Sequence, residues 1–127
     1  MLSTEAIGES DAKGMKIAMC FERKKRRIAD PSPSRRAVGY DIVSKSGKEV
    51  RYIEVKTRFG SFPVALTLNQ HAIAEEKGNE YYLYVVTGEG KICIVQNPVR
   101  KCKVVPVPSV DYRIDNWKEK GKHVNFR

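Results

Sequence analysis

Residues 39–57, GYDIVSKSGKEVRYIEVKT, determine how the rest of the chain is interpreted. Two runs rich in β-branched and aromatic residues, 40–43 and 50–56, flank polar residues around Gly47. This pattern is typical of two antiparallel strands joined by a short turn. Apolar and charged residues alternate in the second run, so one face of that predicted strand packs while the other carries charge.

The predicted hairpin brings two carboxylates to one face of the sheet. With a turn of two or four residues, Asp41 lies opposite Tyr52 and diagonal to Glu54, at a backbone distance of about 7–8 Å. A three-residue turn would place Asp41 on the other face. Two carboxylates about 4 Å apart repel by about 4 kcal/mol at an effective dielectric constant of about 20, and a divalent cation reverses this repulsion. Because the donors are all oxygens, Mg²⁺ or Mn²⁺ is favoured over zinc.

Lys56 lies two residues after Glu54 and on the same face of the predicted strand. Its charge could orient an attacking water or stabilise a phosphate in the transition state. Together with Asp41, the three side chains fit hydrolysis of a phosphodiester bond. The alternative is a solvated strand face with a weak ion pair. Spacing alone favours this alternative.

The flanking segments predict a mixed α/β domain. A proline-free stretch from Ser3 to Ile28, with apolar residues at helical spacing, predicts a first helix, and the prolines and serines of residues 30–34 predict a loop. The hairpin follows, and then a short strand at 64–66.

Thr67 is expected to cap a second helix that ends at Gly78. Residues 81–87 and 91–96 predict two further strands. The order α-β-β-β-α-β-β indicates a mixed β-sheet flanked by helices. We expect a single domain over residues 1–127, with a core at about 13–98 and a C-terminal extension at 99–127.

Composition favours a polyanionic partner. The chain has 127 residues, with 24 Lys and Arg against 15 Asp and Glu, a net charge of +9. Such a balance indicates nucleic acid more than an anionic membrane surface. The three cysteines form no CxxC pair and no apolar run reaches the length of a membrane helix, so we expect a soluble, cytoplasmic protein with no membrane partner.

Three further segments extend the pattern of Asp41 and of Glu54-Val55-Lys56: ALTLNQ at 65–70, YLYVV at 82–86 and IVQNP at 94–98. With them the sequence resembles the PD-(D/E)XK nuclease superfamily, and within it the domain at the C-terminus of NO VEIN proteins, over about residues 13–117. The resemblance implies a restriction-endonuclease-like fold and a Mg²⁺- or Mn²⁺-dependent endonuclease acting on duplex or branched DNA. It also implies attachment to a helicase, a restriction system or another larger polypeptide. The oligomeric state stays open, a homodimer included.

The resemblance assigns metal binding to Asp41 and Glu54, and the positioning of water or charge to Lys56. Gln70 has two interpretations: it assists the metal-bound water, or it forms a capping box with Thr67.

Family members often carry a glutamate on the first helix, and Met15 occupies the matching position here. Glu22 and Asp11 lie on the same helical face as Met15 and could replace that glutamate, and Glu22 is preferred. The absence of a glutamate at Met15 favours a rival function, a non-catalytic nucleic-acid-binding or docking module with a nuclease-like fold. The intact set Asp41, Glu54 and Lys56 favours the enzyme.

A basic cluster surrounds the end of the first helix. It is either a set of solvated cations at a helix C-terminus or a surface that contacts nucleic-acid phosphates, and the second interpretation is preferred. The predicted nucleic-acid-binding residues are Arg23, Lys24, Lys25, Arg26, Arg27, Arg35, Arg36 and Arg58.

Overall fold

The structure, a computed structural model, describes residues 4–32, 38–58, 60, 63–107 and 112–126, with side chains from residue 11 onward. The helices are α1 (Thr4–Lys24), α3 (Leu68–Lys77), α4 (Pro98–Lys101) and α5 (Trp117–Lys120), with a 3₁₀ turn η1 (Gly78–Glu80). The larger sheet contains β1 (Ile28–Pro31), β2 (Ile42–Ser46), β3 (Glu49–Thr57), β5 (Tyr81–Gly88), β6 (Lys91–Gln96) and β9 (Lys122–Asn125). The smaller sheet contains β4 (Val64–Leu66), β7 (Val104–Pro106) and β8 (Tyr112–Ile114).

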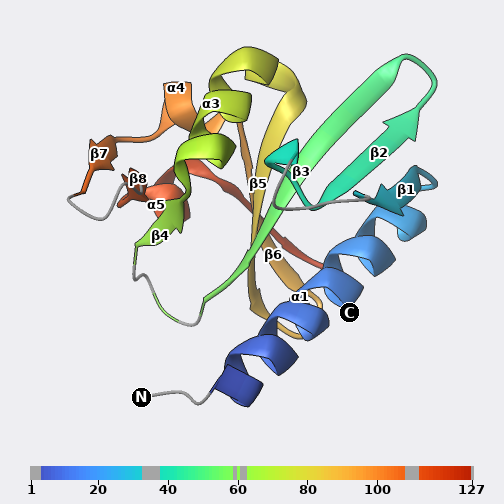
Figure 1. Cartoon of the computed structure of the whole chain (residues 1–127). Helices are drawn as coiled ribbons and strands as arrows, with labels where there is room; N and C mark the ends of the chain where they lie inside the picture. The colour runs from blue at the N-terminus through green and yellow to red at the C-terminus, as the bar shows by residue number, and fades with distance from the viewer. Residues whose placement is uncertain (1–3, 33–37, 59, 61–62, 108–111, 127) are drawn as a thin grey trace.

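The larger sheet has the strand order β1-β2-β3-β5-β6-β9, in which β3 and β5 run parallel and the other neighbours antiparallel (Figure 1). The predicted mixed sheet flanked by helices is therefore confirmed. On one face, Ala18 and Phe21 of α1 pack into the same apolar cluster as Ile53. The other face is covered by the smaller sheet and α5, whose Trp117 is fully buried with Leu83. No helix of the described part of the chain is long and apolar enough to cross a membrane.

The chain between α1 and the hairpin differs from the prediction. Residues 28–31 form the edge strand β1, paired with β2 from Ile28 opposite Lys45 to Pro31 opposite Ile42, where the sequence predicted a helix end and a loop. A proline lacks a backbone donor, but it is tolerated at the end of an edge strand, where one side of the ladder is unpaired.

The β2–β3 hairpin has a two-residue turn at Gly47-Lys48, with Ser46 opposite Glu49. Gly47 adopts φ +58°, which its lack of a side chain allows. The length of the turn is one of those predicted, but the turn lies one residue further along the chain. Each residue of β2 is therefore paired two residues further along β3 than predicted. Ile42 is opposite Ile53. Continuing that register brings Asp41 level with Glu54, and the expected pairing of Asp41 with Tyr52 was wrong.

Local signals at α3 were predicted correctly. The Thr67 hydroxyl accepts a hydrogen bond from the backbone N–H of Gln70, the Gln70 side chain accepts one from the backbone N–H of Thr67, and Gly78 ends the helix with φ +58°. The C-terminal segment contributes more than an extension, because β9 pairs with β6 and forms the edge of the larger sheet.

Candidate functional site

A pocket of about 310 Å³ opens where β2 begins. The last pair of the β2–β3 ladder is Ile42 opposite Ile53, whereas the pairing of β3 with β5 continues to Thr57. The end of β3 therefore has no ladder partner on its β2 side, and side chains from α1, β3 and α3 surround the gap. The lining residues are Asp11, Met15, Asp41, Glu54, Val55, Lys56 and Gln70.

Two largely buried carboxylates form the floor of this pocket. Asp41 is 9% exposed, and its Oδ2 accepts a hydrogen bond from the Val55 backbone N–H at 2.8 Å. Glu54 is 3% exposed, and its Oε2 lies 3.2 Å from the Lys56 ammonium. The other oxygen, Glu54 Oε1, is buried without a hydrogen-bond partner in the described structure. A buried anionic oxygen in this state requires either a proton or a cation.

The environment of Glu54 favours its neutral form when no cation is bound. Burial raises the pKa of Glu54 to about 8, and the neighbouring Asp41 charge acts in the same direction, while Lys56 opposes the rise. A divalent cation between the carboxylates would reverse both unfavourable effects, since it supplies positive charge to the site.

Gln70 combines the two roles that the sequence left as alternatives. Its Oε1 accepts a hydrogen bond from the Thr67 backbone N–H at 2.9 Å, and its Nε2 donates to Glu54 Oε2 at 3.0 Å. The Lys56 ammonium also lies 3.5 Å from Gln70 Oε1. The capping box at the start of α3 thus orients an amide that holds Glu54, and both contacts exist at the same time.

The first helix contributes different residues from those expected. Met15 and Asp11 line the pocket, but Glu22 does not. Glu22 is fully buried at the other end of α1, where its carboxylate accepts hydrogen bonds from Arg27 Nε and Nη2 at 2.6 and 2.8 Å and from the Tyr84 hydroxyl at 2.7 Å. The prediction that Asp11 and Glu22 lie on one face of the helix did not consider their separation along it. Eleven residues of helix place them about 16 Å apart along the axis. The preference for Glu22 over Asp11 is corrected accordingly.

Tyr81 supports the site and was interpreted from sequence only as a sheet residue. Its buried hydroxyl donates to the Gly39 carbonyl at 2.9 Å, two residues before Asp41. Gly39 adopts φ +78° with the Ile73 side chain packed closely against it, so a side chain at this position would be strained and crowded. Nothing in the sequence pattern indicates the bond from Tyr81, because it joins residues 42 positions apart.

The oxygens that the pocket offers as metal ligands are of the right kind for a hard divalent cation, but they are too few to surround it. Asp41 and Glu54 offer carboxylate oxygens, which are the ligands that Mg²⁺ or Mn²⁺ prefers. Glu54 Oε1 accepts no hydrogen bond from the described residues and is therefore available as a metal ligand. No group of three or more His, Cys, Asp or Glu side chains that could hold a metal exists within the described ranges. The pair would therefore need backbone oxygens, water or substrate to complete a coordination shell.

The predicted basic cluster is divided among separate contacts. The Lys24 ammonium donates to the Phe126 carbonyl at 3.3 Å, Arg27 is paired with Glu22, and Arg58 Nη1 donates to the Thr57 carbonyl at 2.7 Å. Arg35 and Arg36 lie outside the described residues.

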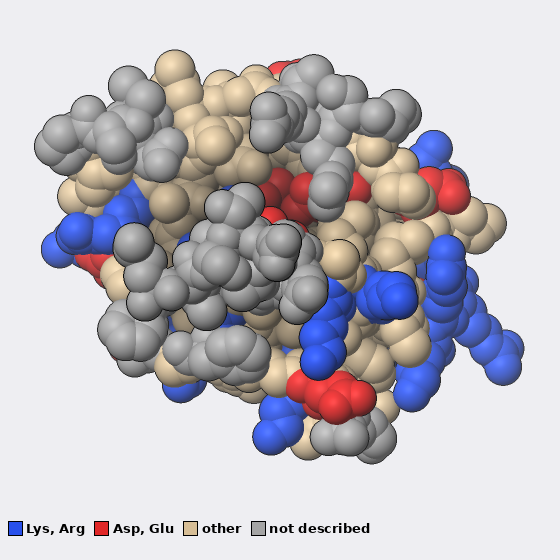
Figure 2. Space-filling view, turned by 60° about the horizontal axis from the view of Figure 1, so that its bottom comes forward, with Lys and Arg blue, Asp and Glu red and all other residues tan. Residues whose placement is uncertain are grey.

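Lys25 and Arg23 are exposed at the end of α1, and Arg26 adopts φ +61° where the helix ends. Figure 2 shows Lys and Arg side chains at both sides of the face in view, with more of them on the right, and acidic side chains near its middle.

Comparison with known proteins supports the same fold. The structure is similar to that of Archaeoglobus fulgidus Hjc, described as a Holliday junction resolvase from an archaeal hyperthermophile, with a TM-score of 0.60 and 21% sequence identity. The similarity covers 84% of this chain and 93% of that chain. No curated protein matches the sequence. The family described as Protein NO VEIN, C-terminal, matches residues 10–96, more than half of the chain, which confirms the resemblance noted in the sequence: this chain belongs to that family.

Proposed function

We propose that this chain is a DNA endonuclease domain of the PD-(D/E)XK type that depends on Mg²⁺ or Mn²⁺. The observation that carries the proposal is the buried Oε1 of Glu54, which lies beside Asp41 and accepts no hydrogen bond from the described residues, in a pocket that Lys56 also lines. In a purely structural ion pair, both carboxylate oxygens are expected to accept hydrogen bonds. An oxygen left without one is instead expected where a cation binds.

Each residue of the pocket has a defined task in this proposal. Asp41 and Glu54 would hold the cation, which supplies Lewis-acid activation of water and of the scissile phosphate. The Val55 N–H orients Asp41, and the Gln70 amide orients Glu54. Lys56, 20% exposed, lies where its ammonium can contact both Glu54 and an entering phosphate oxygen, so it would stabilise the charge that develops on the phosphate.

DNA is the proposed substrate, in duplex or branched form. The net charge of +9 favours a polyanion, and the similar structure is that of a Holliday junction resolvase. We further propose that the domain works as part of a larger polypeptide such as a helicase.

The rival function is a nucleic-acid-binding module without catalysis. It is favoured by Met15, an apolar side chain that lines the pocket where relatives often carry a glutamate. It is also favoured because the described residues contain no group of three or more side chains that could hold a metal. Both functions predict binding, so only a cleavage assay separates them.

The test is incubation of supercoiled, linear, branched and single-stranded DNA with Mg²⁺ or Mn²⁺. Asp41→Asn should abolish cleavage, and Lys56→Ala should lower the turnover rate more than the affinity, because its charge acts mainly in the transition state. Asp30→Asn is the matched control, since Asp30 is exposed and outside the pocket, and it should cut like the natural chain. If the natural chain cuts none of these substrates beyond the background of Asp41→Asn while binding is retained, the rival function is preferred.

A further inference from the structure

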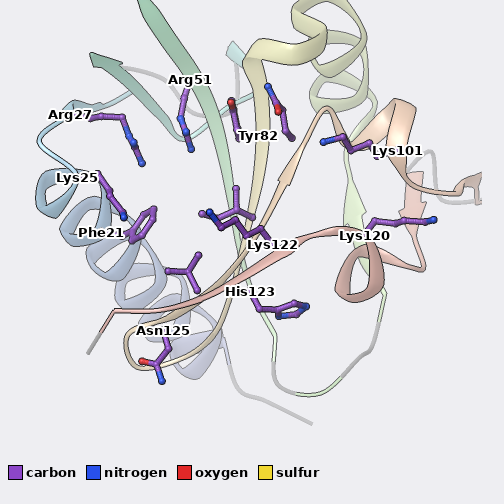
Figure 3. A pocket seen from close by; sticks show the side chains of 13 residues that line it. Phe21, Lys25, Arg27, Arg51, Tyr82, Lys101, Lys120, Lys122, His123 and Asn125 are labelled. Atoms are coloured by element: carbon purple, nitrogen blue, oxygen red, sulfur yellow. The ribbon is translucent and has the colours of Figure 1, made fainter. Parts of the chain in front are cut away.

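A second concave surface lies mainly on the α1 face of the larger sheet, and α4 and α5 also contribute to its lining. Glu54 is paired with Leu83, and successive residues of a strand point to opposite faces, so the neighbouring Tyr82 faces away from the carboxylate pocket. Tyr82 and Ile94 line a groove of about 670 Å³ bounded by the end of α1, β3, β9, α4 and α5 (Figure 3).

Cations line this groove, and no acidic residue does so among the residues that the structure describes. Six of its thirteen lining residues are Lys or Arg: Lys25, Arg27, Arg51, Lys101, Lys120 and Lys122. The four lysines are exposed and form no ion pair within the described part of the chain. Such a concentration of unpaired charge in a concave surface attracts anions.

The two arginines are held in place by ion pairs and hydrogen bonds, Arg27 with the buried Glu22 and Arg51 with the exposed Glu49. Arg27 is paired with the fully buried Glu22, and the Tyr84 hydroxyl donates to the same carboxylate. Arg51 Nη1 donates to the Tyr84 hydroxyl oxygen at 2.9 Å, and its guanidinium lies 4.4 Å from the centre of the Tyr82 ring. Both guanidinium groups are therefore oriented before any ligand arrives, which lowers the entropic cost of binding.

We propose that this groove binds the phosphate backbone of a nucleic acid. The inference goes beyond the proposed nuclease activity and does not depend on cleavage. Phosphate is the group recognised, because the aromatic surfaces are already covered: Arg51 lies over Tyr82, and Lys25 and Arg27 lie over Phe21. Neither the Phe21 ring nor the Tyr82 ring is therefore open as a platform for stacked bases.

A strand with successive phosphates fits the groove better than one small anion. Figure 3 shows Lys25 and Arg27 on the α1 side, and Lys101 and Lys120 across the groove on α4 and α5. The cations are thus spread over both walls rather than converging on one point. The groove and the carboxylate pocket share no lining residue, so the groove is a site separate from the one formed by Asp41 and Glu54.

The experiment measures binding of labelled single-stranded and duplex DNA to the full chain in EDTA at several salt concentrations. The groove variant is Lys101→Glu with Lys120→Glu, and the control is Lys103→Glu with Lys118→Glu. The two variants make the same charge change, at exposed positions on either side of Cys102 and on α5, but Lys103 and Lys118 do not line the groove.

The groove variant should bind at least about tenfold more weakly at 0.1 M salt, and the slope of log Kd against log salt should flatten by about two, one for each lost phosphate contact. The control variant should keep a slope close to that of the natural chain. Stronger loss with duplex than with single strands, or the reverse, identifies which form occupies the groove.

Equal effects of the two double variants, or no effect of the groove variant, would overturn the proposal. The neutral variant Lys101→Gln with Lys120→Gln keeps the test valid if charge reversal unfolds the chain, since it removes the contacts without adding negative charge. The two proposals can fail separately. The loss of binding in EDTA on changing Lys101 and Lys120 tests the groove, and the loss of cleavage in Asp41→Asn tests the carboxylate pocket.

Discussion

Two buried glutamates, Glu22 and Glu54, occupy opposite faces of the same sheet and differ in how their charge is satisfied. Glu22 is fully buried, yet Arg27 and Tyr84 donate to both its oxygens, and these hydrogen bonds outweigh burial and lower its pKa. Glu54 is almost as buried, but one of its oxygens accepts no hydrogen bond from the described residues, and burial raises its pKa to about 8.

The difference distinguishes a structural carboxylate from a reactive one. A buried charge whose hydrogen bonds are complete contributes to the fold, whereas an incompletely satisfied one leaves free energy available for a ligand. The residue type is the same in both places, so the partners alone decide. Changing either glutamate, or the groups around it, should therefore have different consequences at the two places.

The largest effect is expected from Glu22→Ala. It would leave the Arg27 guanidinium without its counter-charge and Tyr84 without its acceptor, and breaking a buried pair in this way lowers the free energy of unfolding by about 3–5 kcal/mol. Urea denaturation at pH 7 measures the change. Glu75→Ala is the control, because Glu75 is an exposed residue whose pair with His71 should contribute under about 0.5 kcal/mol. A loss of less than about 1 kcal/mol for Glu22→Ala would show that the network does not support the fold.

Glu54→Gln should raise the free energy of unfolding, whereas Glu22→Ala lowers it, and the size of this effect should depend on pH. The folded chain holds the Glu54 proton more tightly than the unfolded chain between pH 4.5 and about 8. The free energy of unfolding of the natural chain in EDTA should therefore fall as the pH rises through that window, by up to about 1.4 kcal/mol per pH unit. Glu54→Gln cannot ionise and should lack this fall.

Adding Mg²⁺ at pH 8 sharpens the same measurement. It should stabilise the natural chain, because cation binding to the folded state compensates the buried charge, and it should leave Glu54→Gln nearly unchanged. If the free energy of unfolding of the two proteins depends on pH in the same way in EDTA, the pKa of Glu54 is not raised in the folded chain.

Sequence reasoning predicted best what short-range rules control. Strand alternation placed Glu54 and Lys56 on one face, and the capping box at Thr67 and Gln70 follows from spacing alone. The parity of the hairpin was also predictable, and it brings Asp41 to the same side as Glu54. The exact register was not, because the residues around Gly47 allow the turn to begin at either of two positions.

Features that depend on distant contacts were not predictable. The helical face containing Asp11 and Glu22 could be recognised, but which turn of α1 meets the end of β3 depends on packing of the whole sheet. The groove has no sequence signature, since its cations range from Lys25 to Lys122 and only the fold gathers them. The net charge indicated an anionic partner without indicating where it binds.

The smallest effect separates the two functions of Gln70. Thr67→Ala and Gln70→Ala each disrupt the capping box and should lower the free energy of unfolding by about 1 kcal/mol at pH 5, where Glu54 is protonated. Only Gln70→Ala removes the N–H donor to Glu54 Oε2. Because that hydrogen bond favours the charged carboxylate, its loss should raise the pKa of Glu54 further and extend the pH-dependent fall in stability above pH 8. Stability profiles of the two variants between pH 5 and 9 in EDTA measure this difference. Identical profiles would assign Gln70 to the helix cap alone, whereas a shift confined to Gln70→Ala would assign it to the carboxylate pocket as well.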